Sequence, residues 1–288
     1  MPLPDLVLAW YPGAARDLPW RRPGTTPWGV LVSEFMLQQT PVARVEPVWL
    51  TWMARWPVPS ALAAASRADV LRAWGKLGYP RRALRLHEAA RVLTLGYGDA
   101  VPSDVDVLEA LPGVGSYTAR AVAAFGHGLR CPVVDTNVRR VVARAVHGRG
   151  DAGPARTRAD LADVDALLPV EPATAAVLSA ALMELGAVVC TARVPRCGAC
   201  PLRTTCAWVS AGRPAYAGPR PAAQAFAGTD RQVRGRLLDV LRGAAGPVER
   251  GALDAVWSDA SQRDRCLHSL LVDGLTEQLA DGRFALPA

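Results

Sequence analysis

A glycine-containing turn between two helical segments is the most informative stretch of this sequence, because its residues could do chemistry. The apolar segment ending at Leu111 is followed by Pro-Gly-Val-Gly, and a new helical segment begins at Ser116. Gly113 and Gly115 let the backbone approach a ligand, and the amide groups that open the next helix can bind a phosphate without reading base sequence. Asp135 then places a lone carboxylate at the end of an apolar run. A phosphate anchor followed by a carboxylate suggests chemistry on nucleic acid.

Both features also have a purely structural interpretation. Pro-Gly-Val-Gly is a common way to build a helical hairpin, and an aspartate after an apolar run is often the N-cap of the next helix. These residues alone leave the two interpretations open.

Four cysteines with the pattern C-x6-C-x2-C-x5-C form a second candidate site, at Cys190, Cys197, Cys200 and Cys206. Four thiolates in one compact loop can bind the irons of a [4Fe–4S] cluster. Structural zinc sites usually pair two C-x2-C units, and disulfides are rare in the cytosol. We therefore expect a [4Fe–4S] cluster ahead of zinc, with the default role of shaping the loop. Cys131 and Cys266 stand alone and are expected in the core.

Glu34 is the single carboxylate in a segment, 29–40, that is apolar nearly all round. A buried carboxyl that is not paired has a raised pKa, which suits a general acid near neutral pH. Helical periodicity also allows an exposed edge for Glu34. Glu184 shows the same pattern with no further support, so we interpret it as structural.

The elements that must position these residues are predicted to be helices. Periodicity predicts them at 28–39, 41–52, 60–65, 67–75, 80–95, 104–110, 116–126, 135–147, 157–168 and 172–187. Residues 1–27 are predicted to be irregular, and strand signals are almost absent. The fold class is therefore all-α.

The chain is expected to divide into three parts. Residues 1–210 form the main domain, including the cysteine loop 190–206, and residues 211–229 form an Ala/Gly/Pro-rich linker. Residues 231–288 regain periodicity and predict three helices and a hairpin with Asp281-Gly282 at its turn, a winged-helix-like module.

Composition adds the expected partner and compartment. The 288 residues are 50% hydrophobic and carry a formal charge of +7, which favours a polyanionic partner. The sequence has no signal-peptide pattern and no apolar run long enough to span a bilayer. We expect a cytoplasmic protein that contacts no membrane.

Together these features resemble the helix-hairpin-helix base-excision glycosylases, most closely the MutY-type adenine DNA glycosylases. The resemblance runs from about Trp10 to Trp208. Its motifs are Leu18-Pro19-Trp20-Arg21, Ser33-Glu34-Phe35-Met36-Leu37-Gln38-Gln39-Thr40, Gly75-Lys76-Leu77-Gly78-Tyr79, the 111–119 turn, Asp135-Thr136-Asn137-Val138 and the cysteines. The Met-Leu-Gln-Gln-Thr run is specific to the adenine-excising branch, whereas the turn and the cysteines are shared with endonuclease III-like enzymes.

The resemblance implies catalytic roles for four residues. Glu34 matches the acid that protonates the adenine leaving group and then handles the attacking water. Asp135 matches the carboxylate that stabilises the oxocarbenium character of the sugar, and Asn137 and Tyr117 match positions that support this pair. Glycoside hydrolysis uses the same division of labour.

The resemblance also implies DNA contacts. Gly113 and Gly115 belong to the turn that holds the DNA backbone. The residues matching those near the opposite base are Gln39, Thr40, Leu77 and Tyr79, with Tyr79 as a wedge that fills the stack when the base flips out. The residues matching those around the flipped adenine are Arg16, Leu18, Trp20 and Arg21. Each also has an interpretation as a packing residue, Leu18 and Trp20 above all.

Tyr117 predicts which reaction the chain performs. Relatives that also cleave the strand carry a lysine there, whose amine forms a Schiff base with the sugar. A phenol cannot do this, and Lys76 is the one lysine of the chain. We expect a monofunctional enzyme that stops at the abasic site.

The sequence departs from the family pattern at two places. Thr136 stands where the family usually has glycine, and residues 231–288 do not resemble the Nudix-like domain that typical members carry. The leading hypothesis is a monomeric, nucleoid-associated enzyme that removes adenine from A·8-oxoguanine or A·G mispairs in double-stranded DNA. The alternatives are a related glycosylase acting on T or U opposite G, and a DNA-binding scaffold without activity.

Overall fold

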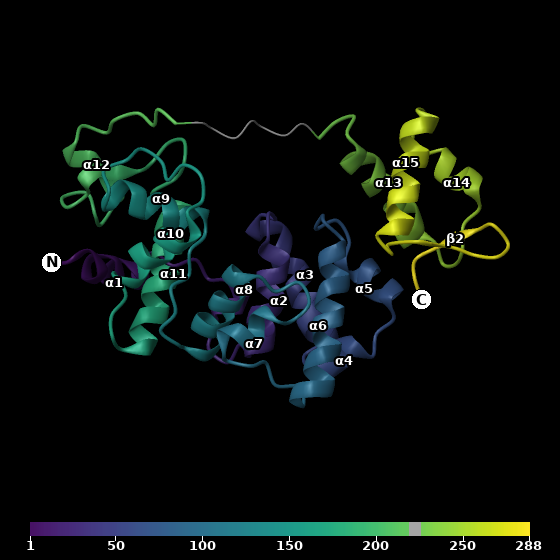
Figure 1. Cartoon of the computed structure of the whole chain (residues 1–288), viewed down its shortest axis with the longest axis horizontal. Helices are drawn as coiled ribbons and strands as arrows, with labels where there is room; N and C mark the ends of the chain where they lie inside the picture. The colour runs from purple at the N-terminus through teal and green to yellow at the C-terminus, as the bar shows by residue number, and fades with distance from the viewer. Residues whose placement is uncertain (219–225) are drawn as a thin grey trace. The chain divides into compact units, whose positions relative to one another are not determined.

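The computed structural model describes residues 1–218 and 226–288, and within them the chain is predominantly helical (Figure 1). It forms two compact units, of which the first contains residues 1–31, 102–110 and 114–221 and the second contains residues 32–101, 111–113 and 222–288. Residues 219–225 of the predicted linker lie outside the described residues.

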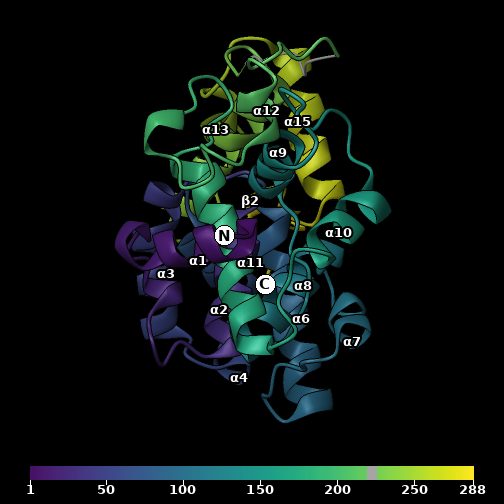
Figure 2. The same ribbon diagram turned by 90° about the vertical axis from the view of Figure 1, so that its left-hand side faces the viewer.

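The first unit is organised around one long apolar helix, α11, which packs against α1, α9 and η2. Figure 2 shows α1 and α11 lying together. The elements of this unit are α1 (Leu3–Ala14), η1 (Pro19–Arg21), the start of α2 (Pro27–Leu37), α7 (Val105–Glu109), α8 (Ser116–Ala121), η2 (Val122–Gly126), α9 (Thr136–Ala145), α10 (Thr157–Asp165), α11 (Pro172–Val188), η3 (Cys197–Ala199) and α12 (Ala207–Ser210).

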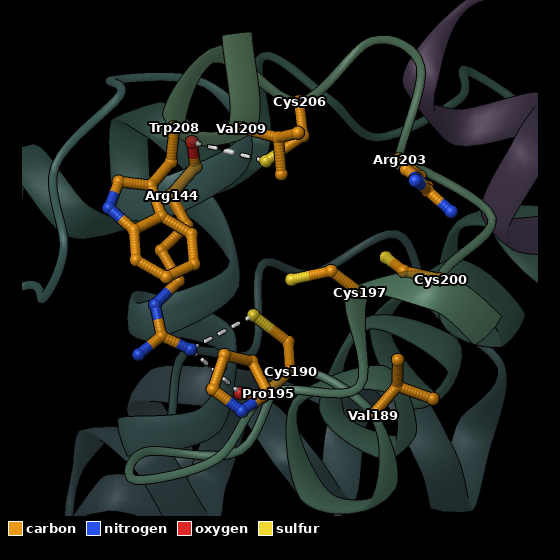
Figure 3. A pocket seen from close by; sticks show the side chains of 10 residues that line it. All are labelled: Arg144, Val189, Cys190, Pro195, Cys197, Cys200, Arg203, Cys206, Trp208 and Val209. Carbon is orange, nitrogen blue, oxygen red and sulfur yellow. Dashed lines mark hydrogen bonds between the residues drawn. The ribbon is translucent and has the colours of Figure 1, made fainter. Parts of the chain in front are cut away.

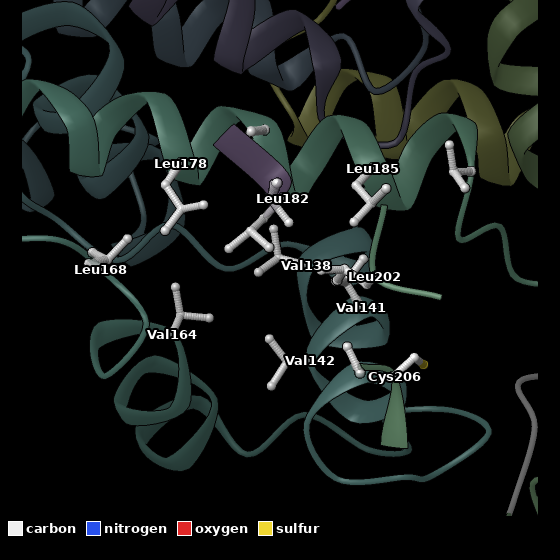
Figure 4. Close-up of a cluster of buried hydrophobic side chains, with 14 of the residues drawn as sticks. Val138, Val141, Val142, Val164, Leu168, Leu178, Leu182, Leu185, Leu202 and Cys206 are labelled. Atoms are coloured by element: carbon white, nitrogen blue, oxygen red, sulfur yellow. The ribbon is translucent and has the colours of Figure 1, made fainter. Parts of the chain in front are cut away.

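The core of the first unit lies between α9 and α11 (Figure 4). Leu178, Leu182 and Leu185 of α11 are fully buried and form one cluster with Val138 and Val141 of α9. Burying a side chain of this size contributes about 1.5–3 kcal/mol. This packing fixes α9, whose N-terminus carries Asp135.

In the second unit, α6 packs against α4 and α5, and α13 packs against α15 and α5. Trp52 stacks edge-on against Trp56 and Trp74, with ring centroids 4.8 and 5.6 Å apart. The elements of this unit are the end of α2, α3 (Val42–Arg55), α4 (Pro59–Ala63), α5 (Arg67–Trp74), α6 (Arg81–Tyr97), α13 (Asp230–Gly243), α14 (Arg250–Asp254), α15 (Ala260–Val272), β1 (Glu277–Gln278) and β2 (Phe284–Ala285).

We call residues 230–288 the C-terminal module. Its three helices are followed by the antiparallel pair β1–β2, in which Glu277 faces Ala285 across the ladder. Gly282 adopts a φ of +86° in the turn between these strands, a conformation that glycine takes without steric cost. Cys266 is 1% exposed, so its prediction as a core residue is confirmed.

The prediction of an all-α fold is confirmed, and the strands of the described residues are the two short ones of the C-terminal module. The prediction that residues 1–27 are irregular is wrong, because α1 occupies Leu3–Ala14. Pro4 lies in the first turn of α1, where the missing N–H costs nothing. Val7 is fully buried in the cluster that contains α11, and this tertiary packing stabilises the helix. Within the described part of the chain, no helix is long and apolar enough to cross a membrane.

Candidate active site

Asp135 is the N-cap of α9, and both of its carboxylate oxygens accept hydrogen bonds. Oδ1 accepts from the backbone N–H of Val138 at 2.7 Å, and Oδ2 accepts from Nδ2 of Asn137 at 2.7 Å. Burial raises the pKa of Asp135, while these two bonds and the charge of Arg140 oppose the rise. The N-cap interpretation is therefore confirmed, and the same geometry holds a partly buried carboxylate in one orientation.

Arg140 supports Asn137 from the other side. Its Nη2 donates to Oδ1 of Asn137 at 2.7 Å and to the carbonyl of Gly186 at 2.6 Å, and its Nε donates to the carbonyl of Cys190 at 2.7 Å. One buried guanidinium thus joins the partner of Asp135 to α11 and to the first cysteine of the loop. The sequence analysis missed Arg140 because helical periodicity places it on the polar face of 136–145, where an arginine is expected to face solvent.

Gly186 allows α11 and α9 to come this close. A Cβ atom at Gly186 would lie 2.7 Å from both the Cβ and the carbonyl oxygen of Asn137, which is closer than real Cβ contacts. Any larger residue would displace Asn137 and with it the Oδ2 bond of Asp135. The sequence analysis missed this residue too, because a glycine inside a helix gives no sign of what it faces.

Tyr117 lies in the first turn of α8, half-buried, two residues after Gly115. Gly113 adopts a φ of +80°, and a Cβ there would lie 2.6 Å from the Cβ of Arg85, so this position requires glycine. Gly115 has extended backbone and open space around its Cα. The open side of the turn therefore lies at Gly115.

Glu34 is buried in α2, with 7% of its surface exposed, between Ser33 and Phe35, which are almost fully buried. The expectation that this carboxyl is buried is confirmed, and the exposed-edge alternative is wrong.

Two turns carry the residues predicted near the opposite base. Gln39 and Tyr79 are exposed and adopt φ values of +54° and +47°, a conformation that costs a non-glycine residue about 1–3 kcal/mol. Thr40 and Leu77 are 6% and 4% exposed and lie inside these turns. The DNA-contact roles of all four residues stay predictions. In this structure Thr40 and Leu77 pack within the protein. We call residues 75–80 the wedge turn.

Arg82 ties both turns together. Its Nη1 donates to the carbonyls of Phe35 and Gln38, each at 2.6 Å, and its Nη2 donates to Oγ1 of Thr40 at 3.0 Å and to the carbonyl of Gly78 at 3.1 Å. Burial lowers the pKa of Arg82 to about 10, so the side chain stays charged at neutral pH. These bonds offset the backbone strain, and the sequence analysis did not find them.

Glu184 has a larger role than the sequence analysis assigned to it. This fully buried carboxylate accepts from Nε and Nη2 of Arg16 at 2.5 and 2.9 Å and from Nη1 of Arg21 at 2.7 Å. It therefore fixes both arginines predicted around the flipped base. Leu18 and Trp20, predicted beside them, are 5% and 7% exposed and belong to the core in this structure.

The four loop cysteines surround one hollow, shown in Figure 3 and lined also by Arg144 and Trp208. Nη1 of Arg144 donates to Sγ of Cys190 at 3.4 Å, and the guanidinium lies 4.7 Å from the centre of the Trp208 ring. Burial raises the pKa of the Cys190 thiol and raises that of Cys200 to about 11. No group of three or more His, Cys, Asp or Glu side chains in the described chain is arranged to hold a single metal ion. Four thiols around one hollow, with a cationic neighbour, are a donor set that fits a polynuclear iron–sulfur group.

The chain resembles known proteins in sequence and in fold. A family model described as "HhH-GPD superfamily base excision DNA repair protein" matches residues 32–164. The chain is 64% identical over 282 residues to the adenine DNA glycosylase of Mycobacterium tuberculosis, covering 98% of this chain and 92% of that protein. It is 66% identical over 284 residues to the adenine DNA glycosylase of Mycolicibacterium smegmatis, covering 98% and 95%.

A solved structure of a thermostable thymine-DNA glycosylase matches with a TM-score of 0.65 at 25% identity, over 72% of this chain and 95% of that chain. Fold and site together define a helix-hairpin-helix protein of DNA repair. The chain belongs to the HhH-GPD superfamily of base excision DNA repair proteins and, within it, to the family of the adenine DNA glycosylases.

The ion pairs of Glu184 predict a pH-dependent stability. Burial acts to raise the pKa of Glu184, but the bonds from Arg16 and Arg21 outweigh it and hold the pKa below the ordinary 4.5. A carboxyl with a lowered pKa stabilises the fold above its unfolded pKa and loses that contribution as pH falls through the folded value. Glu184→Gln should therefore lower the free energy of unfolding by about 2 kcal/mol near neutral pH. This loss is smaller than that for a fully buried ion pair, because Arg16 is partly exposed.

This difference from the wild type should shrink as pH falls below about 4. Urea unfolding at several pH values measures it, with the exposed Glu109→Gln as the control. A difference that stays constant with pH would show that the glutamate acts by packing rather than by charge.

Proposed function

We propose that this protein is a DNA glycosylase that hydrolyses the N-glycosidic bond of adenine mispaired with 8-oxoguanine or guanine. The observation that carries the proposal is the likeness to adenine DNA glycosylases over 98% of the chain. Two carboxyls support it. Glu34 is buried, which suits a general acid, and the partly buried Asp135 is held in one orientation by two hydrogen bonds, which suits a charge-stabilising group.

In the proposed mechanism, Glu34 protonates the adenine ring as the bond to the sugar breaks, and then takes a proton from the attacking water. Asp135 stays ionised and stabilises the positive charge that develops on the sugar. Its position is fixed by the N–H of Val138 and the amide of Asn137, so its negative charge needs no reorganisation when the sugar becomes cationic.

The proposed substrate is double-stranded DNA. The open side of the turn at Gly115 and the start of α8 suit a backbone phosphate. Tyr79 is 43% exposed at the tip of the wedge turn and would fill the space left by the flipped base, whose unstacking costs a few kcal/mol. Arg16 and Arg21, held by Glu184, would contact the flipped adenine. We further propose that the enzyme acts as a monomer associated with the nucleoid.

We also propose that the four loop cysteines bind a [4Fe–4S] cluster. The cluster would cross-link the loop 190–206, and Arg144 would offset the negative charge of its thiolates. Because the carbonyl of Cys190 accepts from Arg140, a fixed loop also keeps the support of Asn137 and Asp135 in place.

A thymine or uracil opposite guanine is the second candidate substrate, since the matching solved structure is a thymine-DNA glycosylase. That likeness is at 25% identity, against 64–66% for the adenine enzymes. The run Met36 to Thr40 also resembles the adenine-excising branch, so adenine is the proposed base.

The proposed reaction is tested with duplexes that carry A·8-oxoguanine, A·G, T·G or U·G, each followed by hot alkali to reveal abasic sites. The wild type should release adenine from the first two. Glu34→Gln should lower the release by at least about a hundredfold, the range of general acid catalysis, while duplex affinity stays within a few fold. Release of thymine or uracil alone would contradict the substrate, and an unchanged Glu34→Gln would contradict the role of Glu34.

Tyr117 gives a second prediction about the chemistry. Incubation of the wild type with substrate and borohydride should trap no covalent complex, because no lysine stands at position 117. Tyr117→Lys should gain a trapped complex and strand cleavage, while Lys76→Arg in that background should not change the yield. A trapped wild-type complex that disappears in Lys76→Arg would show that Lys76 reaches the sugar.

A further inference from the structure

The C-terminal module rests on the segment of the second unit that leads into the wedge turn. Nε of Arg242, near the end of α13, donates to the carbonyl of Leu71 in α5 at 3.1 Å, and the Arg242 side chain is only 12% exposed. Nη2 of Arg72 donates in return to the carbonyl of Ala244 at 3.5 Å. These two hydrogen bonds therefore link the end of α13 to the end of α5, just before the wedge turn begins at residue 75.

Other contacts of the module reach the wedge turn itself and its far end. Nζ of Lys76 lies 3.7 Å from Asp239, and Nη1 of Arg231 donates to Oη of Tyr79 at 3.4 Å. Beyond the turn, Arg81 pairs with Asp273 at 3.2 Å. Each exposed ion pair contributes little to stability by itself. Together with the bond of Arg242, these contacts hold the segment before the turn, the turn itself and the segment after it.

The charge of the module favours a supporting role over a second DNA-binding surface. Residues 230–288 contain eight arginines against nine acidic residues, so the positive excess of the chain lies outside them. Six of these arginines form ion pairs with aspartates of the same module: Arg234, Arg242, Arg250, Arg263, Arg265 and Arg283. Non-specific DNA binding needs a basic surface, which this segment does not supply.

The wedge turn needs such support because its backbone is strained. Gly75, Gly78 and Tyr79 all have positive φ, and tyrosine adopts that conformation reluctantly. We infer that the C-terminal module positions the wedge turn, with Arg242 as the main positioning residue, so that Tyr79 is ready to enter the base stack. The role of Tyr79 rests on the proposed function, whereas the ordering of the turn by the module does not.

The test uses the full-length protein with Arg242→Met, which keeps most of the side-chain volume and removes the donor. Arg283→Met is the matched control, since Arg283 pairs with Asp281 in the distant hairpin. Amide hydrogen exchange is followed in peptides covering 70–82, together with single-turnover release of adenine and affinity for undamaged duplex. The Arg242 variant should exchange faster in 75–80 and release adenine about tenfold more slowly, the effect of losing one charged hydrogen bond, with unchanged affinity for undamaged duplex.

Exchange and release equal to those of the control would overturn the inference, and so would an equal loss in both variants. If Arg242→Met does not fold by circular dichroism, Asp273→Asn removes the charge that pairs with both Arg81 and Arg234 and is expected to speed exchange at the far end of the turn. If the wild type releases no adenine, the proposed function fails, and the exchange measurement still decides whether the module orders the turn.

Discussion

The bonds of the buried Arg140 guanidinium are the interaction on which the arrangement around Asp135 depends. This side chain joins Asn137, the carbonyl of Gly186 and the carbonyl of Cys190, three points from different parts of the chain. A buried guanidinium must satisfy its donors, so each bond constrains a backbone segment as well as a side chain. The carboxylate of Asp135 is thereby oriented by the cysteine loop and by α11, as well as by its own helix.

In the second unit, both terminal nitrogens of Arg82 bind backbone carbonyls, in two turns that are distant in sequence. In the first unit, the buried carboxylate of Glu184 forms ion pairs with both Arg16 and Arg21. In all three cases a charged residue outside the catalytic set orients the predicted site residues. Such networks are specific because each missing partner would leave a buried polar group unsatisfied. Site precision in this protein therefore depends on supporting charges that burial makes costly to disturb.

The sequence predicted those parts of the molecule that local patterns determine. The helices, the buried Glu34 and the N-cap role of Asp135 follow from periodicity and capping, and the spacing of the cysteines indicates a shared ligand. The sequence did not reveal α1, because its prolines argue against a helix and the burial of Val7 that stabilises it is a tertiary contact. It also did not reveal Gly186, Arg140 or Arg82, since their roles are set by tertiary partners about 40 to 50 residues away. Thr40 and Leu77 show the same limit, because a motif gives residue type and spacing but not burial.

The account is tested most directly by the pH dependence of single-turnover adenine release in Asn137→Ala. Asp135 acts ionised, its pKa is raised by burial, and the Asn137 amide opposes that rise together with Val138 and the charge of Arg140. Removing the amide should raise the pKa of Asp135 further, so the acid limb of the rate profile should move to higher pH than in the wild type. A variant that is slower by the same factor at every pH, with the acid limb unmoved, would contradict the claim that Asn137 holds Asp135 in its charged form.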